Sequence, residues 1–293
     1  MNKTILVLPA ALLTGIYALH SSTLATGLKR SAAFIFEKDG TNSLPIGTCF
    51  SVGVSNPKAT YGGGFQYLVT AKHVLVNTNG LPRSNLWVRV NRWKGGSELL
   101  PLFVDSFRPP MFVHTNASVD IAVVGWAPVQ GEFDFPMLPV EMLAEQNAVS
   151  TGRIVEGDDV SFPGLFVSYY GSSNNVPVFR FGRVSILPTE PIQWGKEKCE
   201  LYFIESTCFG GNSGSPVFVR YSMDRNGGLQ VGGNAFFVAG LLIGYFNDLQ
   251  PLKWVDVAAI PVNANNSGIS AVVPAHLIRE ILYSPEMKKS RGE

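Results

Sequence analysis

Three separated segments of the sequence carry side chains that together could perform nucleophilic acyl transfer. His73 follows one apolar run, Asp120 precedes another, and Ser213 lies in a glycine-rich segment. A serine hydroxyl is a weak nucleophile unless a neighbouring base removes its proton, and an imidazole does this near neutral pH. A buried carboxylate holds the imidazole in the required tautomer and stabilises the imidazolium. These residue types therefore predict His73 as the base, Asp120 as the group that orients it, and Ser213 as the nucleophile.

The glycines around Ser213 predict an oxyanion-binding site. Gly210 and Gly211 precede the serine, and glycine lets the backbone curl until two N–H groups point at one position. In this chain the two donors would be the amides of Gly211 and Ser213, which would stabilise the negative oxygen of a tetrahedral intermediate. Removing one such donor costs about 2.7–4 kcal/mol of transition-state stabilisation in a well-studied enzyme.

Other interpretations of these residues are weaker. The glycine-rich segment is no phosphate loop, because no Gly-Lys-Ser/Thr follows, and it is no G-x-S-x-G elbow, because position 215 is serine. Ser215 is the neighbour most easily mistaken for the nucleophile. Asp105 is a reserve candidate for the carboxylate, although no apolar strand follows it. We expect His114 on a loop surface and His276 on the surface of a C-terminal helix.

The composition is that of a large folded protein with a sparsely charged surface. The chain has 293 residues, of which 46% are hydrophobic and 15% are charged, against about 25% charged in an average domain. The apolar fraction excludes global disorder. The net charge of +1 provides no strong field for nucleic acid or for an anionic membrane surface, so we expect no nucleic-acid partner.

The elements that must position the reactive side chains are many short strands and few helices. The 30 Gly and 19 Pro residues punctuate runs that have the patterns of strands. Strands are predicted at 32–36, 46–54, 66–70, 86–90, 99–104, 121–125, 159–162, 178–187, 201–206, 215–220, 236–245 and 269–273. A closing helix is predicted over 274–283, with Leu277, Ile278 and Ile281 on one face. Two strand-rich halves predict a double barrel or a sandwich.

The N-terminus has the pattern of a targeting segment or an anchor, to which we assign residues 1–25. Lys3 precedes the apolar residues 5–19, and the small residues Thr23 and Ala25 follow them, as in a secretory signal. The apolar run is shorter than the ~20 residues of a comfortable membrane span. A cleaved signal, an uncleaved anchor and an ordinary buried helix stay open. The first two would export the rest of the chain to the periplasm or the extracellular space.

The three cysteines, Cys49, Cys199 and Cys208, cannot all pair within one chain. They lack the C-x-x-C spacing of a zinc or redox site. Cys199 and Cys208 lie near the two ends of one predicted strand, too far apart to bond without a bend. We expect three buried free thiols.

The ordered motifs resemble those of the trypsin-like (chymotrypsin-fold) serine peptidases, in particular the bacterial stand-alone and heat-shock-protease branch. The resemblance rests on Thr70-Ala71-Lys72-His73, Asp120-Ile121-Ala122-Val123 and Gly211-Asn212-Ser213-Gly214-Ser215-Pro216. The order His, Asp, Ser matches that family and differs from the orders in subtilisins and α/β-hydrolases. The resemblance covers about residues 30–285.

The resemblance implies an all-β fold of two six-stranded antiparallel β-barrels, a chymotrypsin-like double barrel with a short C-terminal helix. The first barrel, residues 26–140, would carry His73 and Asp120. The second, residues 141–285, would carry Ser213, and the site would lie in the cleft between them. Residues 286–293 would form a tail, and we expect the last of them, 288–293, to be frayed.

Two departures from that family concern activation. Asn212 stands where digestive members have an aspartate that pairs with a newly cleaved N-terminus, and no Ile-Val-Gly-Gly segment follows the leader. The family's disulfide beside the histidine is missing, because Val74 follows His73 and Cys49 has no partner. The site should therefore be preformed or switched by other means.

The resemblance also places a primary pocket for P1, the substrate side chain on the acyl side of the scissile bond. Its base would come from Thr207 and Cys208. Its far wall would consist of Leu242, Ile243, Gly244 and Tyr245. No acid stands at these positions, which disfavours Lys and Arg, and the histidine of the glutamate-specific branch is absent. We expect small to medium apolar P1 side chains.

Three functions follow as hypotheses. The leading one is an exported serine endopeptidase that hydrolyses polypeptides through an acyl-enzyme and needs no metal or cofactor. The second is a double-barrel binding or scaffold module with a latent triad, which Asn212 and the missing activation segment motivate. The third is a regulatory protease anchored in a membrane through residues 5–19.

Overall fold

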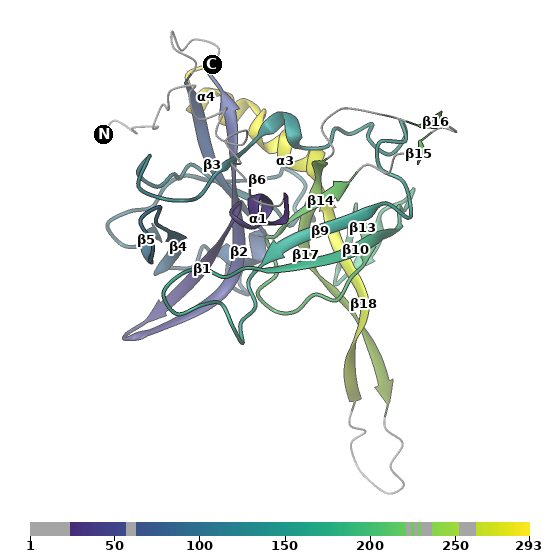
Figure 1. Cartoon of the computed structure of the whole chain (residues 1–293), viewed down its shortest axis with the longest axis horizontal. Helices are drawn as coiled ribbons and strands as arrows, with labels where there is room; N and C mark the ends of the chain where they lie inside the picture. Colours follow the sequence, from purple (N-terminus) through teal and green to yellow (C-terminus); the bar gives the residue numbers. More distant parts are fainter. Residues whose placement is uncertain (1–23, 57–62, 221–223, 226–227, 230–235, 252–261) are drawn as a thin grey trace, which may run out of the picture.

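The computed structural model describes residues 24–56, 63–220, 224–225, 228–229, 236–251 and 262–293 (Figure 1). The apolar stretch of the expected leader therefore lies outside the described residues. Helix α1 (Leu24–Lys29) opens the described chain, so the boundary expected at residue 25 falls within this helix. No helix in these described ranges has the length and apolar character needed to cross a membrane.

The first half of the chain forms an eight-stranded sheet. Its strands are β1 (Ala32–Asp39), β2 (Asn42–Ser55), β3 (Gly64–Thr70), β4 (Leu86–Asn91), β5 (Ser97–Phe103), β6 (Met111–Val113), β7 (Ala122–Val124) and β8 (Met137–Pro139). Seven of them follow the order β5-β4-β1-β2-β3-β7-β6. The long β2 pairs with β1 up to Phe50, and beyond the end of β1 it pairs in parallel with β8.

This sheet differs from the six-stranded barrel that the sequence predicts. Strands β5 and β6 are its two ends, and no ladder joins them among the described strands. β6 and β7 have three residues each, so they offer few backbone groups for a further ladder. A side chain bridges the region instead: the indole N–H of Trp126, just after β7, donates to the carbonyl of Pro101 in β5 at 2.8 Å.

The second half contains the closed six-stranded barrel that the sequence predicts. Its strands are β9 (Asp159–Gly164), β10 (Val178–Ile186), β13 (Tyr202–Glu205), β14 (Pro216–Arg220), β17 (Phe236–Pro251) and β18 (Val262–Pro274). They close in the order β10-β13-β18-β17-β14-β9. Strands β17 and β18 continue past the barrel as a paired arm that projects from the body (Figure 1). The architecture is consistent with a chymotrypsin-like double barrel.

Two short hairpins and three further helical segments complete the described chain. The hairpins are β11 (Ile192–Trp194) with β12 (Glu197–Cys199), and β15 (Asp224–Arg225) with β16 (Gly228–Leu229). The helical segments between α1 and the C-terminal α4 (Pro285–Ser290) are α2 (Lys72–Leu75), the 3-10 turn η2 (Val140–Met142) and α3 (Ala275–Leu282). Helix α3 confirms the predicted closing helix, because Leu277, Ile278 and Ile281 are all buried.

The expectation of a frayed C-terminus is wrong. Residues Pro285–Ser290 form helix α4, and the Ser284 hydroxyl caps it by accepting the backbone N–H of Met287. Met287 is fully buried, and the Arg291 guanidinium donates to the carbonyl of Leu282 at 2.7 Å. The segment is ordered because one apolar side chain and one arginine dock on α3.

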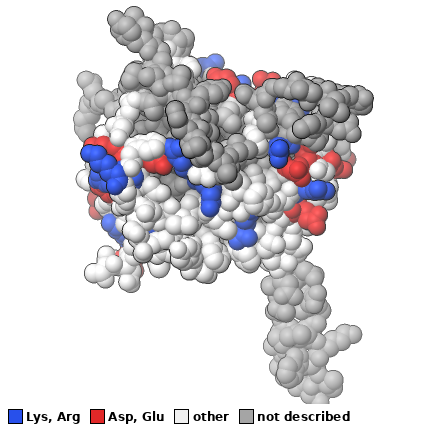
Figure 2. All heavy atoms as spheres, viewed as in Figure 1, with Lys and Arg blue, Asp and Glu red and all other residues white. Residues whose placement is uncertain are grey.

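An apolar core runs through both halves, with Phe50 and Leu68 from the sheet and Phe162 and Phe218 from the barrel among its fully buried members. Charged side chains are sparse on the face shown in Figure 2, in keeping with the low charged fraction of the chain. The two halves meet where β2 contacts the turn that carries Ser213, and this contact positions the candidate site.

Candidate active site

The sheet brings His73 and Asp120 together. Strand β3 ends at Thr70 and the chain turns into α2, so His73 lies at the sheet edge with its side chain half exposed. Asp120 comes just before β7, which pairs with β3 through Ala122 opposite Thr70. In this register Nδ1 of His73 lies 2.5 Å from Oδ2 of Asp120, and the backbone N–H of His73 donates to Oδ1 at 2.9 Å.

The surroundings of Asp120 keep it ionised. Burial of the carboxyl raises the pKa of Asp120, but the hydrogen bonds from His73 and Coulomb attraction to His73 and Lys72 outweigh burial and leave this pKa below its usual value. The Lys72 ammonium is held nearby by donation to the carbonyl of Ala117 at 2.6 Å. An ionised carboxylate accepts the proton on Nδ1, which leaves Nε2 of His73 as the proton acceptor.

Among the described residues, the turn around Ser213 leaves two of its backbone amides without acceptors. Gly211 adopts φ +93° and Gly214 adopts φ +92°, a region that L side chains rarely enter. The N–H of Asn212 donates back to the carbonyl of Phe209 at 3.0 Å and closes the turn. In the described part of the chain, the amides of Gly211 and Ser213 have no acceptor, so two donors are free at one end of the turn.

The hydroxyl of Ser213 donates to the carbonyl of Ile243 at 3.2 Å. Among the described residues no hydrogen bond joins it to His73. Ser213 nevertheless lies beside the strand that leads to His73, because Gly214 packs against the Thr48 carbonyl and the Thr70 hydroxyl with no room for a Cβ. Catalytic hydrogen bonds are often long or misaligned without substrate and tighten in the complex.

Thr48 in β2 fastens the turn to the first half. Its N–H donates to the carbonyl of Ser213 at 2.9 Å, and its hydroxyl donates to the carbonyl of Gly211 at 2.7 Å. The same hydroxyl accepts the N–H of Leu165 at 2.9 Å. Thr48 is fully buried, so its polar atoms must be paired within the protein. One side chain therefore ties three segments together.

Asn212 supports the turn from the barrel side. Its side chain is buried, its amide N–H donates to the carbonyl of Leu165 at 2.7 Å, and its amide oxygen accepts the N–H of Phe209 at 2.9 Å. These neutral bonds occupy the place where the resembled digestive enzymes have a carboxylate. They hold the turn without a charged N-terminus.

The two expected walls of the primary pocket face one another. The Cys208 sulfur lies 3.5 Å from the carbonyl of Gly244, and the Asn266 side chain donates to the Cys208 carbonyl at 2.5 Å. Trp194, from the β11–β12 hairpin, covers Gly244 so closely that an added Cβ would lie 3.2 Å from its ring. Thr207 is exposed beside this contact.

The other residues of the far wall have different surroundings. Leu242 is fully buried, and its backbone N–H and carbonyl pair with Ser215 and Gly214. Ile243 is buried and supplies the carbonyl that Ser213 contacts, whereas Tyr245 is partly exposed. Leu242 thus anchors the strand in the core, and the partly exposed part of this wall begins at Gly244.

Several other titratable residues lie outside this arrangement. The side chain of the reserve carboxylate Asp105 is 96% exposed and pairs with a neighbouring arginine. The expectation of surface positions for two histidines is wrong. His114 lies 2.8 Å from Glu280 with a mostly buried side chain, and the buried His276 lies 3.4 Å from Glu200. Each histidine thus pairs with a glutamate that is about half exposed.

The prediction of three buried free thiols, at Cys49, Cys199 and Cys208, is confirmed. Burial raises the pKa of each thiol above its usual value, although local hydrogen bonds act in the opposite direction. A buried thiol with a raised pKa is a poor nucleophile.

Three residues that touch this region were missed in the sequence, namely Thr48, Trp194 and Arg180. The first two carry no local signal, because their importance comes from contacts with segments far along the chain. Arg180 carries a weak one: it is a charged residue within the predicted strand 178–187, at a position that alternation places on the inner face.

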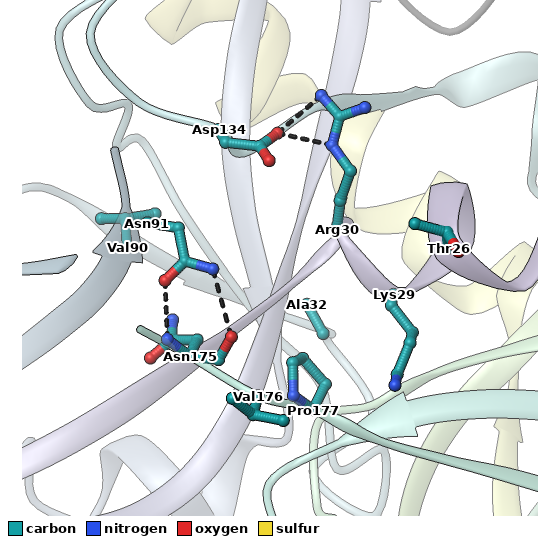
Figure 3. A pocket seen from close by; sticks show the side chains of 10 residues that line it. All are labelled: Thr26, Lys29, Arg30, Ala32, Val90, Asn91, Asp134, Asn175, Val176 and Pro177. Carbon is teal, nitrogen blue, oxygen red and sulfur yellow. Dashed lines mark hydrogen bonds and ion pairs between the residues drawn. The ribbon is translucent and has the colours of Figure 1, made fainter. Parts of the chain in front are cut away.

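A second small pocket lies where α1, β1, β4 and residues 175–177 meet, with a volume of about 200 Å³ (Figure 3). Arg30 pairs with Asp134 on one side of it, with 2.7 Å between Nε and Oδ1. On the other side Asn91 and Asn175 exchange two hydrogen bonds across the two halves, at 2.6 and 3.2 Å. The pocket thus marks a second junction between the halves.

The closed barrel, the neighbouring sheet and the His73–Asp120 pair beside the Ser213 turn fit the trypsin-like serine protease fold. The chain is similar to the MamO protease domain from Magnetospirillum magneticum in its apo form, with 16% identity and a TM-score of 0.49 over 86% of this chain and 96% of that one. It is also similar to an inactive form of Rv3671c from M. tuberculosis that carries a serine-to-alanine mutation. There the identity is 16% and the TM-score 0.44, over 96% of each chain. At this identity neither structure assigns a role to any residue here. No protein-family model and no curated protein matches the chain.

Proposed function

We propose that the protein is a serine endopeptidase with His73 as base, Asp120 as its orienting carboxylate and Ser213 as nucleophile. The observation that carries this is the 2.5 Å contact between Nδ1 of His73 and Oδ2 of Asp120, beside a turn whose Gly211 and Ser213 amides are free. A dyad of this kind leaves Nε2 available as the base, and the free amides suit a developing oxyanion.

The reaction follows from these roles. Nε2 of His73 takes the proton of the Ser213 hydroxyl as Oγ attacks the substrate carbonyl, and the oxyanion accepts hydrogen bonds from Gly211 and Ser213. The imidazolium, stabilised by Asp120, then protonates the leaving amine, and an acyl-enzyme remains. Water, activated by His73, attacks the ester and restores the serine.

The substrate is a polypeptide with a non-basic P1 residue. Of the six positions expected to line the primary pocket, Cys208, Leu242 and Ile243 are buried and Gly244 has no side chain. None of the six offers a carboxylate that could pair with Lys or Arg, which disfavours basic P1 side chains. The preference among non-basic residues is taken up below.

Hydrolysis of an unbiased peptide mixture by the full-length chain tests this proposal. Cleavage products should appear with wild type and with Ser215→Ala, because the Ser215 hydroxyl is buried without a partner and has no part in the chemistry. They should be absent with Ser213→Ala. Cleavage that persists in Ser213→Ala would overturn the assignment of the nucleophile.

A second candidate is a latent or non-catalytic double-barrel module that binds a polypeptide. The bond from Ser213 to the Ile243 carbonyl favours it, because the nucleophile is then engaged away from His73. A folded wild-type chain that binds peptides as well as Ser213→Ala does, and turns none over, would support this candidate over the peptidase.

Export is part of the proposal and rests on the sequence of residues 1–25. A periplasmic or extracellular location follows from either a cleaved signal or an uncleaved anchor through residues 5–19. Sequencing the N-terminus of the protein from its native cell separates the two: a start after residue 25 indicates a secreted peptidase, and an intact start indicates a membrane-anchored one.

A further inference from the structure

Arg180 is placed in β10 on the inner face of the barrel. Its Cα pairs with that of Phe162 in β9, and partners in an antiparallel ladder project to the same face. Phe162 is fully buried in the core. The neighbours Phe179 and Phe181 project to the opposite face, where their rings pack edge to face at 5.1 Å. Arg180 is therefore a cation on an otherwise apolar face.

The guanidinium of Arg180 reaches the segment that leads to the nucleophile. Beyond the ladder between β10 and β13, the Ser206 hydroxyl donates to the Phe181 carbonyl at 2.9 Å, so the chain after β13 continues alongside β10. This brings Cys208 and Phe209 beside Arg180, and the guanidinium carbon lies 4.9 Å from the centre of the Phe209 ring. Cys208 belongs to the expected primary pocket, and Phe209 comes two residues before Gly211.

Arg180 has no anionic partner among the described residues. Its Nε is shielded from solvent and has no acceptor, and no carboxylate pairs with the guanidinium in this part of the chain. Arg183, three residues further on, shows the contrast, because it is exposed and lies 3.3 Å from Asp159. Burial lowers the pKa of Arg180, and the Cys208 sulfur acts in the opposite direction.

A shielded N–H of Arg180 without an acceptor is unfavourable until an acceptor reaches it. A guanidinium stays charged at neutral pH and binds a carboxylate through two parallel hydrogen bonds. Arg180 is only partly exposed and its Nε is shielded without an acceptor among the described residues, so a carboxylate that reached the guanidinium would satisfy this donor and pair with the charge. The contact with the Phe209 ring is a cation–π interaction, which needs none of the guanidinium N–H groups as a hydrogen-bond donor.

We propose that Arg180 makes the protein select an acidic P1 residue, Asp or Glu, in its substrates. This inference rests on the proposed peptidase function and deepens it. The family resemblance places the pocket walls at residues 207–208 and 242–245. Arg180 comes from β10, which belongs to neither wall, and for that reason an apolar preference was expected.

Two peptides that differ only in Glu or Gln at P1 test the inference with the full-length chain. The side chains have the same shape and differ in charge, so the ratio of kcat/KM for Glu over Gln isolates the contribution of the charge. We expect a ratio of about 10–100 in wild type, the range that one well-placed group gives. It should fall to about 1 in Arg180→Gln, and an intermediate ratio should remain in Arg180→Lys, which keeps the charge without the planar fork.

Arg183→Gln is the matched control, because it removes a cation from the same strand at an exposed position that already has a partner. It should leave the Glu/Gln ratio unchanged. Labelling of Ser213 by a fluorophosphonate shows whether each variant keeps an intact nucleophile. An equal ratio in wild type and Arg180→Gln, with Ser213 labelled in both, would overturn the inference, as would a ratio near 1 in wild type.

Measuring peptide binding tests the role of Arg180 separately from the proposed peptidase activity. Ser213→Ala binds peptides without turnover, so its affinity for the Glu and Gln peptides reports on recognition alone. Tighter binding of the Glu peptide that disappears in the Ser213→Ala, Arg180→Gln double variant supports the role of Arg180 even if wild type turns nothing over. Equal affinity for both peptides rejects that role.

Discussion

At the scale of single residues, the proposed catalytic activity depends on the Asp120 carboxylate. Asp120→Asn keeps the size of the side chain but replaces an acceptor of the Nδ1 proton by an amide that favours the wrong tautomer of His73. We expect kcat to fall by about 10⁴-fold, as in the best-studied triad, with a smaller change in KM. Steady-state kinetics on a peptide substrate measure this, and a loss of under tenfold would contradict the role of Asp120.

Asp120 also makes the stability of the fold depend on pH. Its pKa is lowered in the folded protein, since the bonds and charges of His73 and Lys72 outweigh burial. A carboxylate with a lowered folded-state pKa contributes stability that is fully present above its unfolded pKa and is lost as pH falls through the folded value.

Denaturant unfolding of wild type and Asp120→Asn between pH 6 and pH 2 checks this dependence. The loss of stability below about pH 4, near the pKa of an unfolded aspartate, should be shallower in the variant. Parallel curves for the two proteins would show that Asp120 is not the group responsible.

At the scale of elements, Thr48 connects β2 to the Ser213 turn and to Leu165. Thr48→Val keeps the shape but leaves the buried Leu165 amide without an acceptor, so we expect a loss of about 1–3 kcal/mol of unfolding free energy. kcat should fall as well, since the Gly211 peptide loses its support. Thr48→Ser retains the hydroxyl and should recover most of both quantities. Unaltered kcat in Thr48→Val would show that Thr48 does not support the catalytic turn.

Asn212 tests whether neutral bonds hold the same turn. Asn212→Asp would bring a buried carboxylate against the Leu165 carbonyl, which at present accepts an N–H at 2.7 Å. Two acceptors repel and the charge has no partner, so we expect strong destabilisation, of about 3 kcal/mol or more, and weak labelling of Ser213. Thermal unfolding measures the first effect. A stable, fully active Asp variant would indicate a cation close to this site.

At the scale of the whole molecule, the site exists because two halves are fastened to each other. Arg89 in β4 is buried and donates to the carbonyls of Gly171 and Asn174, at 2.6 and 2.7 Å, across the junction. Arg89→Met leaves those carbonyls unpaired and should cost about 1–3 kcal/mol. Faster proteolysis within residues 166–177 should accompany it. Arg83→Met, which breaks a partly exposed pair with Glu37 and a hydrogen bond to the Val76 carbonyl, should cost less than Arg89→Met.

Features that depend on residues close together in the sequence could be predicted, and features that depend on contacts between distant segments could not. Most of the longer strands and helix α3 could be predicted because alternation and helical periodicity are local patterns, whereas the three-residue strands β6, β8, β11 and β12 were missed. The closed second barrel followed from the family resemblance. The eight-stranded first sheet was not predicted, because the parallel pairing of β8 with β2 joins segments about 85 residues apart, and such distant pairing leaves no local pattern. Helix α4 was missed because its sequence is mostly polar or charged and contains a single apolar residue, Met287, that becomes buried.

Some residues of the candidate site could likewise be predicted from the sequence, and others could not. His73, Asp120 and Ser213 stand in motifs with a recognisable order, and the structure brings His73 against Asp120 and the Ser213 turn against β3. Thr48 and Arg180 act through contacts that only the folded chain creates, so their residue types alone indicated nothing specific.

The most direct test of the central claim is covalent labelling of the folded, full-length chain with a fluorophosphonate, followed by mass spectrometry of the adduct. We expect the label on one residue, Ser213, to the same extent in wild type and Ser215→Ala. No label should appear in Ser213→Ala or His73→Ala. A folded wild-type protein that takes no label, or takes it at another residue, would contradict an assembled His73–Asp120–Ser213 site.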